Sequence, residues 1–125
     1  MKKVDRPSLV RLMEEDKIYL NNCLRLNDVS ALLNVPSAQV TLAVRKYFRC
    51  NLRTLLNYYR VRHAKMLLSK RAGNITQIAE RSGFLSRSTF YLSFRTFEKG
   101  IPTEFIGLPG RQEDPVKGAI VKRND

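Results

Sequence analysis

The chain has 125 residues, enough for one domain or two very small ones around a modest hydrophobic core. Its formal net charge of +12 favours a polyanionic partner or an acidic membrane surface. No window is apolar enough to span a membrane, and the N-terminus lacks an apolar signal segment, so we expect a soluble, cytoplasmic protein without membrane contact. Two cysteines, Cys23 and Cys50, are too few for a disulfide scaffold, and we expect both to be small buried side chains in a reducing compartment.

Helical periodicity dominates, and no segment shows the alternation of a strand. Apolar residues at three- and four-residue steps, with Ser, Asn, Gly and Pro at the ends, predict an all-α fold of about seven helices. These helices are expected at residues 7–20, 26–34, 36–48, 52–69, 76–81, 86–98 and 103–106. The tail, residues 107–125, is rich in Gly, Pro and charge and is expected to be flexible.

The basic residues are unevenly placed along this series. No acidic residue lies between Asp28 and Glu80. An ordinary solvated surface mixes both signs of charge, whereas this segment sustains one sign, which favours nucleic acid. Its basic residues are Arg45, Lys46, Arg49, Arg53, Arg60, Arg62, Lys65, Lys70 and Arg71.

A repeat connects the predicted helices. Ser30 and Asn34 correspond to Ala79 and Gly83 at an offset of 49 residues, and after the turn the offset becomes 50, as between Arg45 and Arg95. Each copy is a helix, a tight turn and a second helix. The implied organisation is a lead-in helix (1–23), a first unit (24–51), a linking helix (52–70), a second unit with a final short helix (71–106) and the tail (107–125).

Such a unit fits a helix-turn-helix, in which the first helix is a brace and the second lies in the DNA major groove. The turn needs a residue that tolerates positive φ, which Gly83 supplies outright and Asn34 less comfortably. Ser30 and Ala79 provide the small residue that packs between the two helices. The linking helix would be roughly 26 Å long. It could set the two reading helices about one DNA turn apart, near 34 Å.

Two sequence runs carry a family resemblance. "YYRVRHAKMLL", followed by "ITQIAERSGFLSRSTFYLSFRTFEKGIPTEFI", resembles the DNA-binding domain of AraC/XylS-family transcription regulators over about residues 24–105. The resemblance implies seven helices in two subdomains and, for most members, activation of transcription beside RNA polymerase. "LMEEDKIYLNN" looks like the lead-in found where this domain ends a larger sensor-regulator, particularly in Bacteroides-type bacteria. This favours a fragment of a longer regulator that dimerises elsewhere over a self-sufficient monomer.

The chain departs from the family pattern around both reading helices. Arg49 and Lys99 stand where the family usually has Gly, although Gly100 follows in the second copy. Leu42 and Leu92 stand where the family often has Arg, which suggests contact with thymine methyl groups or less specific reading.

Helix phase predicts which side chains face DNA. Gln39 could bond adenine, Arg45 could reach guanine or a phosphate, and Arg87 lies in the first turn of its helix, where insertion is deepest. Base-reading candidates are Ala38, Gln39, Thr41, Leu42, Arg45, Arg87, Ser88, Tyr91 and Leu92.

Phosphate contacts are expected from cations and from helix N-termini, where free N–H groups favour anions. Ser37 and Ser86 are expected to be helix caps, with phosphate contact as the alternative. Tyr59 is expected in the core, and Tyr58, like Tyr91, on sugar or methyl groups. Phosphate candidates are Ser37, Arg45, Lys46, Arg49, Arg53, Ser86, Arg95, Lys99 and Thr103.

Other functions find less support. Nothing in the sequence indicates an enzyme or a cofactor. It has no paired carboxylates near an apolar pocket, no His or Cys with a base partner and no Gly-rich phosphate loop. His63 has no Cys or His at metal-ligand spacing. A protein-interaction module that uses Leu42, Leu92 and Tyr91 remains the alternative, and RNA is third because a duplex-RNA major groove is too narrow for a presented helix.

Overall fold

The computed structural model describes residues 3–108, and all regular structure in that range is helical. The predicted all-α fold is therefore confirmed. In chain order the elements are α1 (Arg6–Glu14), a short 3-10 helix η1 (Ile18–Leu20), α2 (Leu26–Leu33), α3 (Ser37–Phe48), α4 (Leu52–Ser69), α5 (Ile75–Arg81), α6 (Arg87–Glu98) and a second 3-10 helix η2 (Pro102–Phe105).

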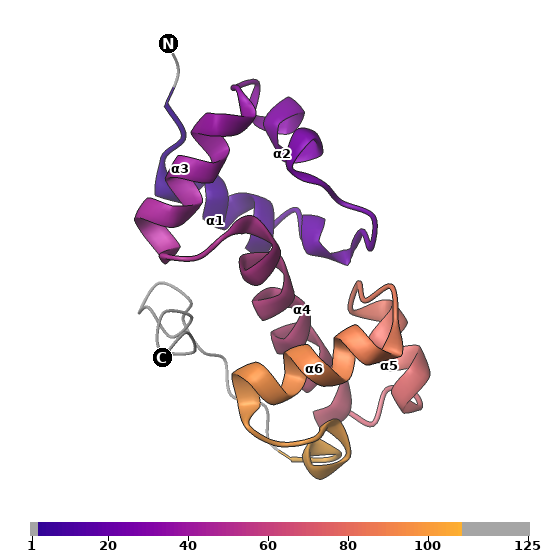
Figure 1. Cartoon of the computed structure of the whole chain (residues 1–125). Coiled ribbons are helices and arrows are strands. Elements are labelled where there is room, and N and C mark those ends of the chain that lie inside the picture. The colour runs from indigo at the N-terminus through magenta and orange to yellow at the C-terminus, as the bar shows by residue number, and fades with distance from the viewer. Residues whose placement is uncertain (1–2, 109–125) are drawn as a thin grey trace.

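Helix α4 is the central element. In Figure 1 α1, α2 and α3 lie toward one end of α4, and α5 and α6 lie toward the other. α4 contacts α3, α5, α6 and both 3-10 helices. Because it packs on several sides, the adjacent residues Tyr58 and Tyr59 are both buried. The expectation that Tyr58 would reach DNA is thus wrong: its ring packs edge-on against Tyr59 and Phe97.

The lead-in does not form the single predicted helix of residues 7–20. α1 begins at its N-cap Asp5, whose carboxylate accepts a hydrogen bond from the Ser8 amide at 2.9 Å, and ends at Glu14. Lys17 then adopts a left-handed conformation with φ 51°, after which η1 begins. In η1 the Tyr19 carbonyl accepts a hydrogen bond from Arg60 Nε of α4 at 2.7 Å. This contact with a distant residue accompanies the break and is invisible in the local sequence pattern.

The two turns repeat the same backbone hydrogen bonds. After α2, the Val35 amide donates to the Ser30 carbonyl at 3.2 Å, and after α5 the Phe84 amide donates to Ala79 at 3.0 Å. This six-residue closure is the one that ends many helices in a left-handed residue. Asn34 (φ 55°) and Gly83 (φ 94°) are those residues, as predicted. A Cβ at Gly83 would collide with the Tyr19 carbonyl, so the lead-in packs directly on the second turn.

The ends of the two reading helices are also alike. Arg49 donates its amide to the Arg45 carbonyl at 2.9 Å, and Lys99 donates to Arg95 at 2.9 Å. Arg49 (φ 56°) and Lys99 (φ 57°) are both left-handed, so the exit that glycine usually provides is kept without glycine.

The core runs through both halves of the molecule. Phe90 and Phe94 are fully buried and Phe97 nearly so, as their spacing predicts. Cys50 is buried as expected, but Cys23 is exposed, contrary to the prediction. Cys23 lies between η1 and α2, outside any helical face, and its Sγ donates to Asn22 Oδ1 at 3.1 Å.

Candidate nucleic-acid interface

Helix α3 presents one polar and mixed face to solvent. Ala38, Leu42, Arg45 and Lys46 are exposed, whereas Gln39 and Thr41 are half-buried. Val40 and Val44 on the opposite face are fully buried. The helix-phase prediction of exposed side chains therefore holds for Ala38, Leu42 and Arg45, whereas Gln39 and Thr41 are only partly exposed.

Helix α6 repeats that arrangement. Arg87, Ser88, Tyr91, Leu92 and Arg95 are all exposed. The apolar stripe on its other face is buried against the core, so the helix is fixed on one side and open on the other.

The first turns of the two helices differ. Ser86 is the N-cap of α6, and its Oγ accepts a hydrogen bond from the Thr89 amide at 3.2 Å, as predicted. Ser37 is not a cap. Pro36, with φ −61°, occupies the N-cap position, and Ser37 is the first residue of α3, where its Oγ donates to Asn27 Oδ1 of α2 at 2.9 Å.

The remaining phosphate candidates cluster where each reading helix ends and the next element begins. Arg49 and Lys99 follow α3 and α6 directly. Arg53 is the second residue of α4, and Thr103 is the second residue of η2. All four side chains are exposed. They occupy equivalent positions in the two copies, which gives each copy a cation at its helix exit.

Three cations of the acid-free segment are instead engaged by other residues of the fold. Arg60 is 8% exposed and donates to the carbonyls of Tyr19 (2.7 Å) and Asn21 (3.0 Å); this burial, aided by the charge of Arg53, lowers its pKa. Arg62 Nη1 lies 3.5 Å from Glu14 Oε2, and Lys65 Nζ lies 3.0 Å from Glu98 Oε1. The acid-free run is therefore not a wholly exposed positive surface.

The exposed faces of the reading helices nevertheless carry one sign of charge. α3 contains no carboxylate, and the single one in α6, Glu98, is 13% exposed in its side chain and engaged by Lys65. Arg45, Lys46, Arg87 and Arg95 thus stand without an acid on their own helix faces, as contact with a polyanion requires.

Sequence reasoning missed the residues that orient this interface. Arg60 holds the lead-in to α4, and the Lys65–Glu98 pair ties the end of α6 to α4. No local motif marks these contacts, because the partners are far apart in the chain.

The described residues contain neither a metal-binding cluster nor a membrane-spanning helix. Among residues 3–108 no group of three or more His, Cys, Asp and Glu side chains could hold a metal ion. Over the same range no helix is long and apolar enough to cross a membrane.

Comparison with known families and structures adds the decisive observation. Residues 29–107, more than half of the chain, match the model of a family described as "Helix-turn-helix domain". The chain belongs to the AraC-type helix-turn-helix family. The predicted family resemblance is thereby confirmed. Domains of this AraC-type family bind DNA in transcription regulators and are not enzymes, so this chain is a DNA-binding domain of a transcription regulator.

Solved structures share the AraC-type fold. The C-terminal domain of AraT, a response regulator from Geobacillus stearothermophilus, has a TM-score of 0.67 at 24% identity, covering 78% of this chain and 80% of that one. A Listeria innocua protein of unknown function has a TM-score of 0.69 at 20% identity (79% and 91% covered). The C-terminal domain of the two-component response regulator yesN from Fusobacterium nucleatum has a TM-score of 0.65 at 23% identity, covering 72% of this chain and 87% of that one. No curated protein matches the sequence.

Proposed function

We propose that this domain binds double-stranded DNA sequence-specifically, with α3 and α6 in successive major-groove segments. The observation that supports this most is the duplicated geometry. Both helices follow turns closed by the same hydrogen bond, end in the same left-handed exit and flank one central helix. A helix held on one side by the core and open on the other can enter the groove without rearrangement.

The proposed base contacts come from the exposed faces of the two helices. Gln39 would bond adenine, Arg45 guanine or an adjacent phosphate, and Arg87 a base from the first turn of α6. Leu42 (61% exposed) and Leu92 (67% exposed) would pack on thymine methyl groups. The remaining proposed contributors to base reading are Ala38, Thr41, Ser88 and Tyr91.

The proposed phosphate contacts hold the helices in register. Arg49 and Lys99 would bind the backbone at the helix exits, and Arg53 and Thr103 would bind it from the first turns of α4 and η2. Ser37, Arg45, Lys46, Ser86 and Arg95 complete the set.

We further propose a cytoplasmic, activating role beside RNA polymerase, as the output end of a longer regulator that dimerises elsewhere. Two of the similar solved structures are themselves C-terminal domains of response regulators. The domain division proposed from the sequence, with units at 24–51 and 71–106 joined by 52–70, accords with this role.

The salt dependence of binding to duplex DNA tests the proposal. Each phosphate neutralised by a Lys or Arg steepens the fall of log affinity with log salt by about 0.9, so the six cations among the proposed phosphate contacts predict a slope of roughly −5. Arg95→Gln should make that slope shallower by about 1. Lys70→Gln, outside the proposed contacts, should leave it unchanged. Absence of salt-sensitive binding would contradict the proposal.

One observation favours a second candidate. Leu42, Leu92 and Tyr91 are large apolar side chains exposed on the same helix faces, and they could dock another protein's helix. Such binding would depend only modestly on salt, so the same titration separates the two functions.

A further inference from the structure

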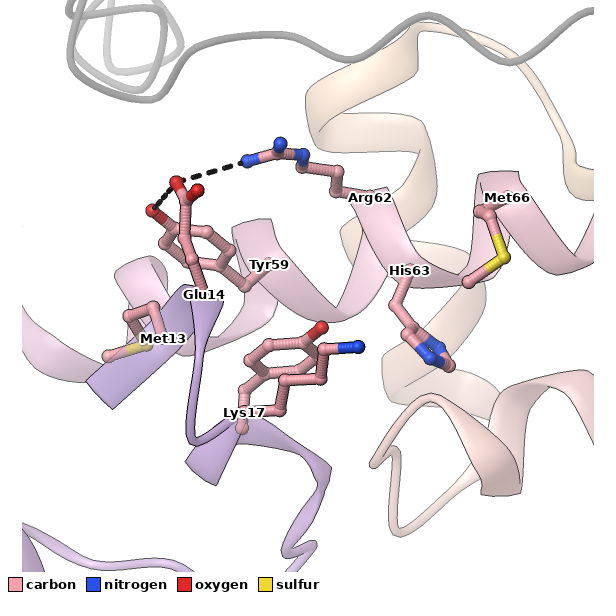
Figure 2. Close-up of a pocket in the computed structure, with 8 residues that line it drawn as sticks. Met13, Glu14, Lys17, Tyr59, Arg62, His63 and Met66 are labelled. Carbon is pink, nitrogen blue, oxygen red and sulfur yellow. Dashed lines mark hydrogen bonds and ion pairs between the residues drawn. The ribbon is translucent and has the colours of Figure 1, made fainter. Parts of the chain in front are cut away.

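A small pocket lies where the lead-in meets α4, away from the proposed DNA-facing side chains. Its volume is 180 Å³, and Met13, Tyr19, Tyr59 and Met66 provide its apolar and aromatic walls. Figure 2 shows the polar lining: Glu14 and Lys17 from the lead-in, Arg62 and His63 from α4. A cavity of about 150 Å³ accommodates a benzene ring, so this pocket has room for a molecule with one ring.

The walls are suited to a compact apolar body. The Tyr19 and Tyr59 rings stack with centroids 5.7 Å apart and an interplanar angle of 22°. Met13 is fully buried behind them, and Met66 is half-buried. Thioether side chains adjust to irregular shapes at little cost and contact rings favourably, so this lining can close around a small ligand.

The charges favour an anion. Glu14, the one acid in the lining, already accepts a hydrogen bond from the Tyr59 hydroxyl at 3.1 Å and lies 3.5 Å from Arg62 Nη1. The Lys17 ammonium has no hydrogen-bond or ion-pair partner among residues 3–108, although Lys17 is held in a left-handed conformation. His63 is half-buried, and its pKa is lowered by burial and by the charges of Lys17 and Arg81. The pocket therefore carries an excess of positive charge.

We propose that this pocket binds a small organic monocarboxylate with a compact apolar body. Its carboxylate lies on Lys17 and Arg62, and its body lies against the Tyr59 ring and Met66. His63 connects the pocket to the second helix-turn-helix: its Nδ1 is 3.3 Å from Ser82 Oγ, and Ser82, fully buried, directly precedes the turn residue Gly83. Binding to the pocket itself does not depend on DNA binding.

The single histidine of the chain provides a direct test. The imidazole resonance of His63 in the full chain is followed by NMR during titration with cyclohexanecarboxylate, and in parallel with the uncharged cyclohexanecarboxamide. We expect a saturable shift with the carboxylate, and an increase in the pKa of His63 because the bound anion opposes the charge of Lys17. The amide should cause no saturable shift. An unshifted resonance, or equal responses to both compounds, would refute the site.

A pair of variants separates the site from general surface charge. Lys17→Asn removes the ammonium but keeps a residue that tolerates the left-handed conformation, and it should weaken binding about tenfold. Lys70→Asn removes a charge that is also exposed but lies outside the pocket, and this variant should bind like the unmodified chain. Undiminished affinity in Lys17→Asn would overturn the proposal.

Discussion

Arg49 and Lys99 adopt positive φ angles at positions where glycine would be less strained. Arg49 and Lys99 end the reading helices in the left-handed region, which costs an L-residue about 1 kcal/mol. In return each exit carries a cation at the place where the proposed phosphate contact lies. Local stability and DNA affinity are therefore expected to oppose each other at these positions.

Lys99→Gly tests that opposition. Glycine relieves the left-handed strain, so the free energy of unfolding should rise by about 0.5–1 kcal/mol, while duplex affinity falls with the loss of the cation. Urea denaturation and DNA titration measure the two effects. Lys70→Gly is the matched control: Lys70 has φ −92°, so glycine there should lower stability. If the Lys99→Gly variant is stabilised and its DNA affinity is undiminished, Lys99 does not contact DNA.

His63 makes stability depend on pH near neutrality. Its pKa in the folded chain lies below the ordinary 6.5, because of burial and then the charges of Lys17 and Arg81. The unfolded chain therefore takes up a proton first as pH falls, and the free energy of unfolding decreases as pH falls through 6.5 toward the folded-state pKa. Denaturation series from about pH 7.5 to about pH 5.5 should show this decrease, and His63→Gln should flatten it. Equal slopes for both proteins would contradict the assignment.

At the scale of elements, the position of α6 depends on α4. Lys65 and Glu98, 12% and 13% exposed in their side chains, form an ion pair of 3.0 Å, and Lys65 Nζ lies 6.0 Å from the centre of the Phe105 ring. The pair connects the last residue of α6 to the central helix and to η2. The orientation of the second reading helix thus rests on a contact shielded from water.

Glu98→Gln should lower the free energy of unfolding by about 1–3 kcal/mol, because the Lys65 charge stays shielded without its counter-charge. Arg62→Gln breaks the more exposed pair with Glu14 (22% and 38%) and should cost less than about 1 kcal/mol. Chemical denaturation of the two variants decides between these values. If Arg62→Gln costs as much as Glu98→Gln, the Lys65–Glu98 pair has no special role in holding α6.

The helices themselves were largely predictable, since their signals are local. The predicted start of α4 at residue 52 and its end at 69 agree with the structure, because apolar spacing marks the helix; in the structure the Asn51 side chain caps its start by accepting a hydrogen bond from the Thr54 amide. The end of α1 was not predictable. The chain turns there, and η1 carries the Tyr19 carbonyl to Arg60, a contact between distant residues. Propensity alone favours continuing the helix, and tertiary contacts override it.

At the scale of the whole molecule, the sequence predicted which helix faces are exposed better than it predicted where positive charge lies on the surface. Helix phase placed Leu42, Arg87 and Leu92 on open faces, because one apolar stripe fixes the opposite side of each helix. The absence of acids over residues 29–79 suggested a continuous positive surface. The structure instead turns Arg60 and Lys65 inward, and Lys65 meets an acid from outside that segment. Pairing across the fold cannot be read from one-dimensional spacing.

The central claim is that α3 and α6 both read DNA, and selection of binding sites from random duplex DNA with the full chain tests it most directly. We predict two enriched boxes about one helical turn apart, near 34 Å between centres. Arg45→Ala and Arg87→Ala should each relax a different box. A single enriched box, or no enrichment despite salt-sensitive binding, would contradict the account.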